Sequence, residues 1–210
     1  MQTTRLPNDA KAGPTKPEVR AVLERKLALG PDDHFVEVGS CTGAVTVEAA
    51  RRAGQVTALE RKGDRLETTR ANLAANGIDA GDGDDAGDDA AGDQDETGDG
   101  DVSLVHAEAP EELPADGTVL FLGGSRNYEA ILDAALDAEY DRIVMNVSRL
   151  EVAGEAARAF RERDVLDETL CLQVATGYDL AGATSFDANN PVYMLIAEPG
   201  SSGNPQEGGA

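Results

Sequence analysis

The sequence predicts an α/β protein with a doubly wound, mostly parallel seven-stranded sheet and a C-terminal antiparallel hairpin strand. Three observations predict it. Short apolar runs alternate with segments of helical periodicity, several runs end at glycines, and the last two runs have no helix between them. A chain of 210 residues, 40% of them hydrophobic, suffices for one domain with helices on both faces of a sheet.

The first helix is expected to begin at Thr15. This residue can cap a helix, Pro17 suits a first helical turn, and Glu18 lies three residues on, as a capping box requires. Apolar residues then recur at helical spacing until Gly30-Pro31, which is expected to end the helix.

The later elements follow the same alternation. The strands are short apolar runs, typical of parallel strands buried on both faces. We expect strands at residues 34–38, 55–60, 102–106, 118–122, 142–147, 169–175 and 191–197, and helices at 44–53, 64–75, 128–138 and 150–163. Because no helix separates the last two strands, one of them should run antiparallel. In such a sheet, ligands bind at the carboxyl ends of the strands.

Three segments are expected to differ from the packed domain of residues 13–198. Residues 1–12 and 199–210 are predicted to be flexible ends. Residues 79–101 contain eleven acidic residues and no basic one. This segment has too few apolar residues to offset the entropy of ordering, so we expect a disordered insert. A calcium loop is the alternative interpretation, but no bidentate Glu follows at EF-hand spacing.

Acidic residues dominate the chain. Asp and Glu number 40 against 18 Lys and Arg, a formal net charge of −22, and the insert supplies half of it. Such a chain repels phosphates, so neither nucleic acid nor an anionic membrane is expected as a partner. High acidity with only four lysines is typical of salt-loving organisms, whose cytoplasm screens the self-repulsion.

Cysteine usage and the apolar pattern both point to the cytoplasm. Cys41 and Cys171 are far apart, and no Cys/His cluster has metal-ligand spacing, so neither a structural disulfide nor a metal site is expected. No apolar stretch approaches the roughly 20 residues of a membrane span, and the first residues lack a signal-peptide run.

Polar features at three successive strand ends indicate a nucleoside site. The segment EVGSCTG at 37–43 is a glycine-containing turn between a strand and a helix, where backbone N–H groups can approach a ligand. Glu60 closes the second strand about twenty residues later and can accept both ribose hydroxyls. Glu108-Ala109 follows the third strand, where a carboxylate and backbone amides can read adenine.

A dinucleotide site is the competing interpretation of these features. Its G-x-G-x-x-G fingerprint needs three glycines, whereas this chain has G-x-C-x-G followed by Ala44. Glu37, before the first glycine, has no role in that fingerprint. The segment is more similar to that of S-adenosylmethionine-dependent methyltransferases, in which the equivalent acid lies near the methionine end of the cofactor.

Six segments resemble one family, the decarboxylating cobalt-precorrin-6B methyltransferases, and the carboxyl-terminal half of a bifunctional precorrin methylase. They are GPTKPEVRAVL (13–23), VEVGSCTGAVTVEAA (36–50), ALER (58–61), AEAPEEL (107–113), FLGGS (121–125) and FDANNPVYML (186–195). Many methyltransferases share the nucleoside motifs, whereas GPTK, FLGGS and NPVY distinguish this family. The resemblance spans residues 13–197 and is interrupted only by the acidic insert.

The resemblance implies a Rossmann-like class I methyltransferase fold, S-adenosyl-L-methionine as the cofactor and often a homotetramer. Its reaction methylates carbon 15 of a cobalt-precorrin and removes carbon dioxide from the ring-C acetate. The implied cofactor-binding residues are Thr15, Glu37, Gly39, Ser40, Cys41, Thr42, Gly43, Glu60, Glu108 and Ala109. No catalytic residue is indicated, because positioning supplies most of the acceleration when the donor is an activated sulfonium.

Three cations lie at predicted carboxyl-side edges of the sheet and are placed to clamp acetate or propionate groups of the macrocycle. They are Lys16, Arg126 and Arg149. Replacing Arg126 with Ala is therefore expected to weaken macrocycle binding and to leave cofactor affinity unchanged.

The chain departs from the family pattern at three places. Cys41 replaces the usual middle glycine of the loop, Glu108 replaces an Asp, and residues 138–141 replace a Lys-Pro-Gly-Gly turn. A Cβ at Cys41 is tolerable if its φ is negative, so we expect cofactor binding to survive. Two alternatives stay open: a methyltransferase acting on RNA or protein, and a non-catalytic cofactor-binding homologue.

Overall fold

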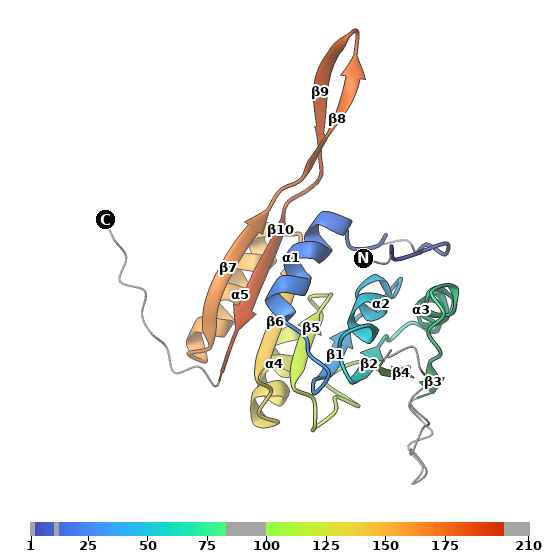
Figure 1. Cartoon of the computed structure of the whole chain (residues 1–210). Helices are drawn as coiled ribbons and strands as arrows, with labels where there is room; N and C mark the ends of the chain where they lie inside the picture. The colour runs from blue at the N-terminus through green and yellow to red at the C-terminus, as the bar shows by residue number, and fades with distance from the viewer. Residues whose placement is uncertain (1–2, 11–12, 83–99, 200–210) are drawn as a thin grey trace.

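The computed structural model describes residues 3–10, 13–82 and 100–199 (Figure 1). Its centre is an eight-stranded sheet in the order β3-β4-β2-β1-β5-β6-β10-β7. The strands are β1 His34–Val38, β2 Gln55–Leu59, β3 Gly81–Asp82, β4 Asp101–Val105, β5 Val119–Leu122, β6 Arg142–Val147, β7 Leu166–Leu172 and β10 Val192–Ala197. Strands β1 to β6 pair in parallel, and β10 runs antiparallel to both β6 and β7. This confirms the predicted sheet, to which β3 adds a two-residue edge strand.

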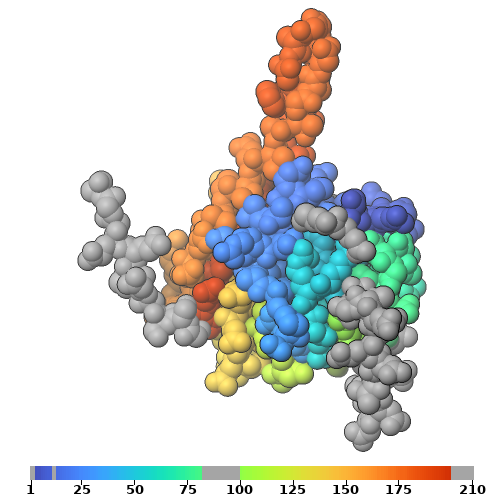
Figure 2. Space-filling model, viewed as in Figure 1, coloured from blue at the N-terminus to red at the C-terminus, as the bar shows by residue number. Residues whose placement is uncertain are grey.

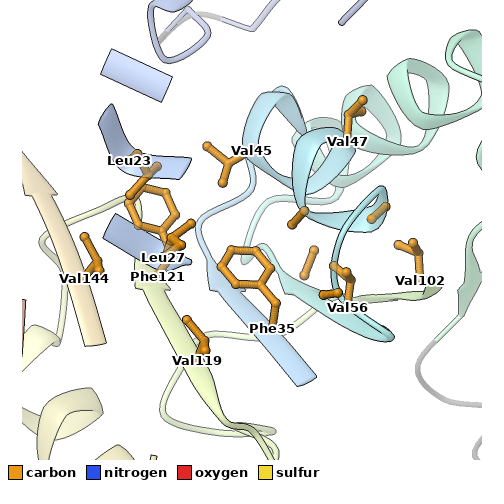
Figure 3. Close-up of a cluster of buried hydrophobic side chains, with 14 of the residues drawn as sticks. Leu23, Leu27, Phe35, Val45, Val47, Val56, Val102, Val119, Phe121 and Val144 are labelled. Carbon is orange, nitrogen blue, oxygen red and sulfur yellow. The ribbon is translucent and has the colours of Figure 1, made fainter. Parts of the chain in front are cut away.

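Within the described ranges, five helices cover the two faces of this sheet. They are α1 Pro17–Leu27, α2 Ala44–Ala50, α3 Gly63–Ala75, α4 Tyr128–Asp137 and α5 Leu150–Glu162. One core cluster packs α1, α2 and α3 against the sheet, and Figure 3 shows part of it around Phe35 and Phe121. The other packs α4 and α5 against the opposite face. Neighbouring strand residues enter opposite clusters, as Phe35 and Val36 do, because side chains alternate along a strand.

The start of α1 differs from the prediction. The N-cap is Lys16, and no side chain makes a capping bond there, so the predicted Thr15 cap and its capping box with Glu18 are wrong. Arg20 ties this turn down in their place. Its guanidinium donates to the Thr15 carbonyl and, through Nε, to Glu48 Oε1 at 2.8 Å.

Two further strands form a hairpin that the sequence analysis missed. Strands β8 Ala175–Leu180 and β9 Ala183–Ala188 pair only with each other and project from the body of the protein (Figures 1 and 2). The turn is Ala181-Gly182, with φ values of 56° and 81°. The hairpin lies between β7 and β10, where a direct connection was expected.

The acidic insert and the chain ends are described only in part. Gly81 and Asp82, at the start of the insert, pair with β4 and extend the edge of the sheet. The rest of the insert, residues 83–99, lies outside the described residues, as do residues 1–2, 11–12 and 200–210 of the predicted flexible ends. Within the described ranges, no helix has the length and apolar character needed to cross a membrane.

Candidate functional site

A cleft of about 590 Å³ opens at the carboxyl edge of the sheet, a size typical of a small-molecule site. It is bordered by the ends of β1, β2, β5 and β6, by the start of α1 and by the connection from β9 to β10. The predicted site residues that line it are Thr15, Lys16, Glu37, Gly39, Ser40, Cys41, Thr42, Glu60, Glu108, Ala109 and Arg126. Segments from most of the chain therefore converge on the edge where the sequence placed the ligand.

Gly43 serves packing at the end of the loop and does not line the cleft. Its φ is +71°, and a Cβ there would lie 2.9 Å from Cγ2 of Thr69 on α3. Only glycine lets α3 approach so closely. The Thr69 hydroxyl shares a hydrogen bond of 3.0 Å with Ser40 Oγ, which fixes the loop against α3.

Cys41 adopts a left-handed conformation with φ of +56°. The expectation of a negative φ is therefore wrong, and the residue occupies a conformation that favours glycine. Contacts on both sides hold it in place. Its N–H donates to Glu60 Oε2 at 3.3 Å, and Thr69 Oγ1 donates to its carbonyl at 3.3 Å.

Glu60 presents a fixed carboxylate at the end of β2. Only 4% of the residue is exposed. Besides the Cys41 N–H, its Oε1 accepts the Lys62 N–H at 3.0 Å. Two backbone donors therefore orient the carboxylate, whose remaining lone pairs are available to hydroxyl donors of a ligand.

Glu37 is a buried acid on β1, two residues before the glycine loop of residues 39–43. The pKa of its carboxyl is raised to about 8, chiefly by burial; the Thr46 hydrogen bond opposes this shift and the nearby charge of Glu60 adds to it. The Thr46 hydroxyl donates to Glu37 Oε2 at 2.6 Å. Glu37 is therefore a protonated acid at neutral pH, and a cationic ligand group beside it would favour its ionisation.

Hydrogen bonds join Glu108-Ala109, the segment that follows β4, to the start of α4. Asn127, which caps that helix with φ of +54°, donates through Nδ2 to Glu108 Oε1 at 3.3 Å and to the Ala109 carbonyl at 3.2 Å. Arg126 lies 3.5 Å from the same Glu108 oxygen. Arg126, predicted to bind the macrocycle, and Glu108, predicted to bind the cofactor, are thus an ion pair.

Arg149 does not line the cleft. It is the N-cap residue of α5, and its guanidinium donates to Ser125 Oγ at 3.5 Å. The position of Arg149 therefore gives no support to its predicted role in binding the macrocycle.

Several residues that line the cleft were not among the predicted site residues. They include Arg61, Arg65, Asn146, Ser148, Asn189 and Asn190. Asn146 had a signal in the sequence, since it is the one polar residue among the apolar residues that follow Arg142 in RIVMNV. Asn189 and Asn190 precede β10 within FDANNPVYML (186–195), one of the segments that resemble the family.

Comparison with known proteins gives close relatives of one kind. No protein-family model matches the chain. A "Probable cobalt-precorrin-6B C(15)-methyltransferase (decarboxylating)" of Halobacterium salinarum is 65% identical over 197 residues, covering 93% of this chain and 94% of the relative. A protein of the same name from Methanosarcina acetivorans is 31% identical over 193 residues, covering 89% of this chain and 94% of the relative.

Solved structures agree with these relatives. A precorrin 8W decarboxylase from Methanobacterium thermoautotrophicum superposes with a TM-score of 0.73 at 29% identity, covering 88% of this chain and 91% of the other. A precorrin-6Y C5,15-methyltransferase from Geobacter metallireducens gives 0.73 at 30% identity, covering 90% and 93%. The chain has the Rossmann-like class I methyltransferase fold and belongs to the family of decarboxylating cobalt-precorrin-6B C(15)-methyltransferases.

Proposed function

We propose that this protein is an S-adenosylmethionine-dependent methyltransferase of corrin biosynthesis. It methylates carbon 15 of cobalt-precorrin-6B and removes the carboxyl group of the ring-C acetate as carbon dioxide. The observation that carries the proposal is the 65% identity to the Halobacterium salinarum relative over 93% of the chain. The cleft supports it, because the glycine loop, Glu60 and Glu108 lie together at one edge of the sheet.

The residues of the cleft fit S-adenosylmethionine. The Glu60 carboxylate, held by the N–H groups of Cys41 and Lys62, is oriented to accept ribose hydroxyls. Glu37 lies where a ligand cation would draw off its proton, which suits the methionine end of the cofactor. The bound cofactor supplies a methyl group on a sulfonium, already activated for transfer. The protein then needs mainly to align the acceptor carbon with that methyl group and to exclude water.

The macrocycle would occupy the part of the cleft beyond the glycine loop. Lys16, at the start of α1, and Arg126, before α4, are the predicted cations that line the cleft. Both are placed to bind peripheral carboxylates that the product retains. The conjugated ring itself offers the nucleophilic carbon and accepts the electron pair released by decarboxylation.

We also propose a homo-oligomer, a tetramer by family resemblance, in which the β8–β9 hairpin contacts another copy. An isolated two-stranded sheet is marginally stable in water. This hairpin exposes Tyr178, Leu180 and Phe186, each with about half or more of its surface accessible. The cytoplasmic location and the exclusion of nucleic acid and membrane partners remain proposals that follow from the acidic composition.

Calorimetric titration in high salt tests the cofactor site first. Micromolar binding of S-adenosylhomocysteine and no binding of NAD are expected, whereas binding of NAD alone would contradict the proposal. Turnover is then followed by mass spectrometry of cobalt-precorrin-6B, which should gain one methyl group and lose one carbon dioxide. Cofactor binding without turnover would favour the non-catalytic homologue, and methylation of RNA or protein in place of the corrinoid would favour the other alternative.

A further inference from the structure

Asn146 is a buried carboxamide without a partner. It follows three fully buried apolar residues of β6, Ile143, Val144 and Met145. Its Oδ1 and Nδ2 are both buried, and neither has a hydrogen-bond partner in the described part of the chain. The other buried side-chain atom in this state is His34 Nδ1, which lies 3.4 Å from a carboxylate oxygen of Asp116. A donor and an acceptor left unsatisfied on one side chain destabilise the protein unless a ligand completes them.

Asn146 is among the residues that line the cleft, and it lies one residue before the carboxyl end of β6. Because side chains alternate along β6, it shares a face with Val144, which packs beside Phe121 under α1 (Figure 3). Glu37 pairs with Phe121 in the register of β1 and β5 and lies on this face too. Asn146 therefore faces the same side of the sheet as the buried acid of the cofactor site.

Two glycines, Gly39 and Gly123, lie between the end of β1 and Asn146, and they bring the backbones of β1 and β5 close together at this edge of the sheet. The registers align Val38 of β1 with Leu122 of β5, and Leu122 with Met145 of β6. Continuing these registers by one residue brings Gly39, Gly123 and Asn146 into line, and Gly39 and Gly123 are in close approach there. Two strand spacings separate the outer pair, about 10 Å. Asn146 is thus beyond the glycine loop, in the part of the cleft left for the acceptor.

Neutral polar side chains line the cleft near Asn146 in sequence or along the neighbouring strand β10: Ser148, Asn189 and Asn190. Among the described residues, no cation donates a hydrogen bond to Asn146. A retained carboxylate is held well by Lys or Arg. A cation paired with the carboxylate that must leave would stabilise a charge that the transition state disperses, and would slow its loss. A neutral carboxamide orients such a group without a counter-ion.

We propose that Asn146 binds the carboxyl group of the ring-C acetate, the group that is lost as carbon dioxide. This inference rests on the proposed function and names the residue that holds the leaving group. Nδ2 donates to a carboxylate oxygen, and Oδ1 accepts from a water that accompanies the carboxylate. The bond between the acetate methylene and the carboxyl carbon then breaks, and its electron pair passes into the conjugated ring. Carbon dioxide leaves, and a proton from solvent adds to the methylene to give a methyl group.

Variants of Asn146 separate the two halves of the reaction. Asn146→Leu keeps the branching at Cγ, replaces the carboxamide with two larger methyl groups and so removes the donor, and Asn146→Asp keeps the shape and adds a negative charge. Met145→Leu, on the opposite face of β6, is the matched control for disturbance of the strand. Each is incubated with cobalt-precorrin-6B and S-adenosylmethionine, and mass spectrometry resolves methylated product with and without the carboxyl group. S-adenosylhomocysteine affinity is measured in parallel.

Asn146→Leu should bind S-adenosylhomocysteine within about twofold of wild type and should accumulate methylated product that retains the carboxyl group. The decarboxylated fraction is expected to fall at least about tenfold, and further in Asn146→Asp because of like-charge repulsion. Asn146→Ala, which also lacks a donor, provides the same test if Asn146→Leu does not fold. A wild-type product ratio, an equal loss of both steps, or loss of cofactor affinity alone would overturn the inference. If wild type itself yields no product, the proposed function fails and the inference fails with it.

Discussion

At the scale of single residues, Glu37 makes stability depend on pH. Its pKa rises from 4.5 to about 8 on folding, chiefly through burial, so the unfolded chain releases this proton at a lower pH than the folded chain. The contribution of Glu37 to stability is therefore lost as the pH rises from about 4.5 to about 8, and it is constant above that range.

Glu37→Gln should remove this dependence. The amide oxygen can still accept the Thr46 hydroxyl, and no buried carboxylate has to ionise. In thermal unfolding without ligand, the free energy of unfolding of the variant should increase relative to that of wild type from pH 5 to pH 8, by a few kcal/mol at most. If the difference in stability between variant and wild type does not change with pH, Glu37 is not a buried protonated acid. The same variant should bind S-adenosylmethionine more weakly, since it cannot supply a negative charge.

Cys41 is strained by its positive φ, and Cys41→Gly should relieve that strain. A left-handed conformation costs a non-glycine residue about 1–2 kcal/mol, and the greater freedom of glycine in the unfolded chain offsets part of the gain. We expect a net stabilisation of about 0.5–1 kcal/mol in denaturant unfolding, with S-adenosylhomocysteine affinity retained. Cys41→Val, which adds a branched Cβ, should destabilise the protein. Equal stability of the two variants would show that the loop is not strained here.

The sequence predicted residues whose positions depend only on where a strand ends. Glu60 and Glu108 belong to this group, because the ends of β2 and β4 follow from apolar runs. The φ of Cys41 depends on contacts with Glu60 and Thr69, which no local pattern contains. Asn146 lies inside an apolar run. Its neighbours indicate a strand, but their pattern does not reveal that this residue lines a cleft.

At the scale of elements, α3 joins the N-terminal segment to the loop of residues 39–43 through one side chain. Asn72 is fully buried and accepts the Asn8 N–H at 3.0 Å. Its Nδ2 donates to the carbonyls of Asn8 and Thr42, both at 2.8 Å. One turn later, Asn76 accepts the Arg5 N–H at 3.0 Å but has no bond to the loop. Both asparagines therefore hold the N-terminal segment, but only Asn72 also binds the loop.

Asn72→Ala and Asn76→Ala separate docking of the N-terminal segment from support of the loop. Both should increase amide hydrogen exchange in residues 3–10. Asn72→Ala alone should lower S-adenosylhomocysteine affinity, by about tenfold, because the Thr42 carbonyl loses a buried donor worth about 1–2 kcal/mol. Equal affinities of the two variants in calorimetry would refute the link between Asn72 and the loop.

Among the elements, the sequence predicted the buried strands well and missed the exposed hairpin. Buried strands were located to within a residue or two at most ends, since each has a sharp apolar run. The β8–β9 hairpin was missed because its residues are mostly exposed and small or polar, and its turn, Ala181-Gly182, lacks the usual Asn-Gly or Asp-Gly. A strand that buries nothing within its own chain leaves no periodic signal.

At the scale of the whole molecule, the net charge of −22 opposes association between copies. At high ionic strength the Debye length shrinks to a few ångströms, so this repulsion is confined to direct contacts. The identity to a Halobacterium salinarum protein agrees with the salt-adapted composition. Any test of assembly therefore belongs in molar salt, where apolar contacts are strengthened and like charges are screened.

The hairpin is where such an assembly should form, because its large apolar side chains are left exposed in the described part of a single copy. Tyr178, Leu180 and Phe186 are 47%, 57% and 67% exposed. Replacing all three with Ser should convert the oligomer to a smaller species in light scattering in molar salt, with S-adenosylhomocysteine affinity reduced no more than about twofold. Thr176→Ser and Asp179→Asn, on the same hairpin, should leave the mass unchanged. A wild-type monomer would contradict the proposed oligomer, whereas a triple variant with the mass of the wild-type oligomer would place the interface elsewhere. In either case the exposed apolar residues of the hairpin would require a different partner.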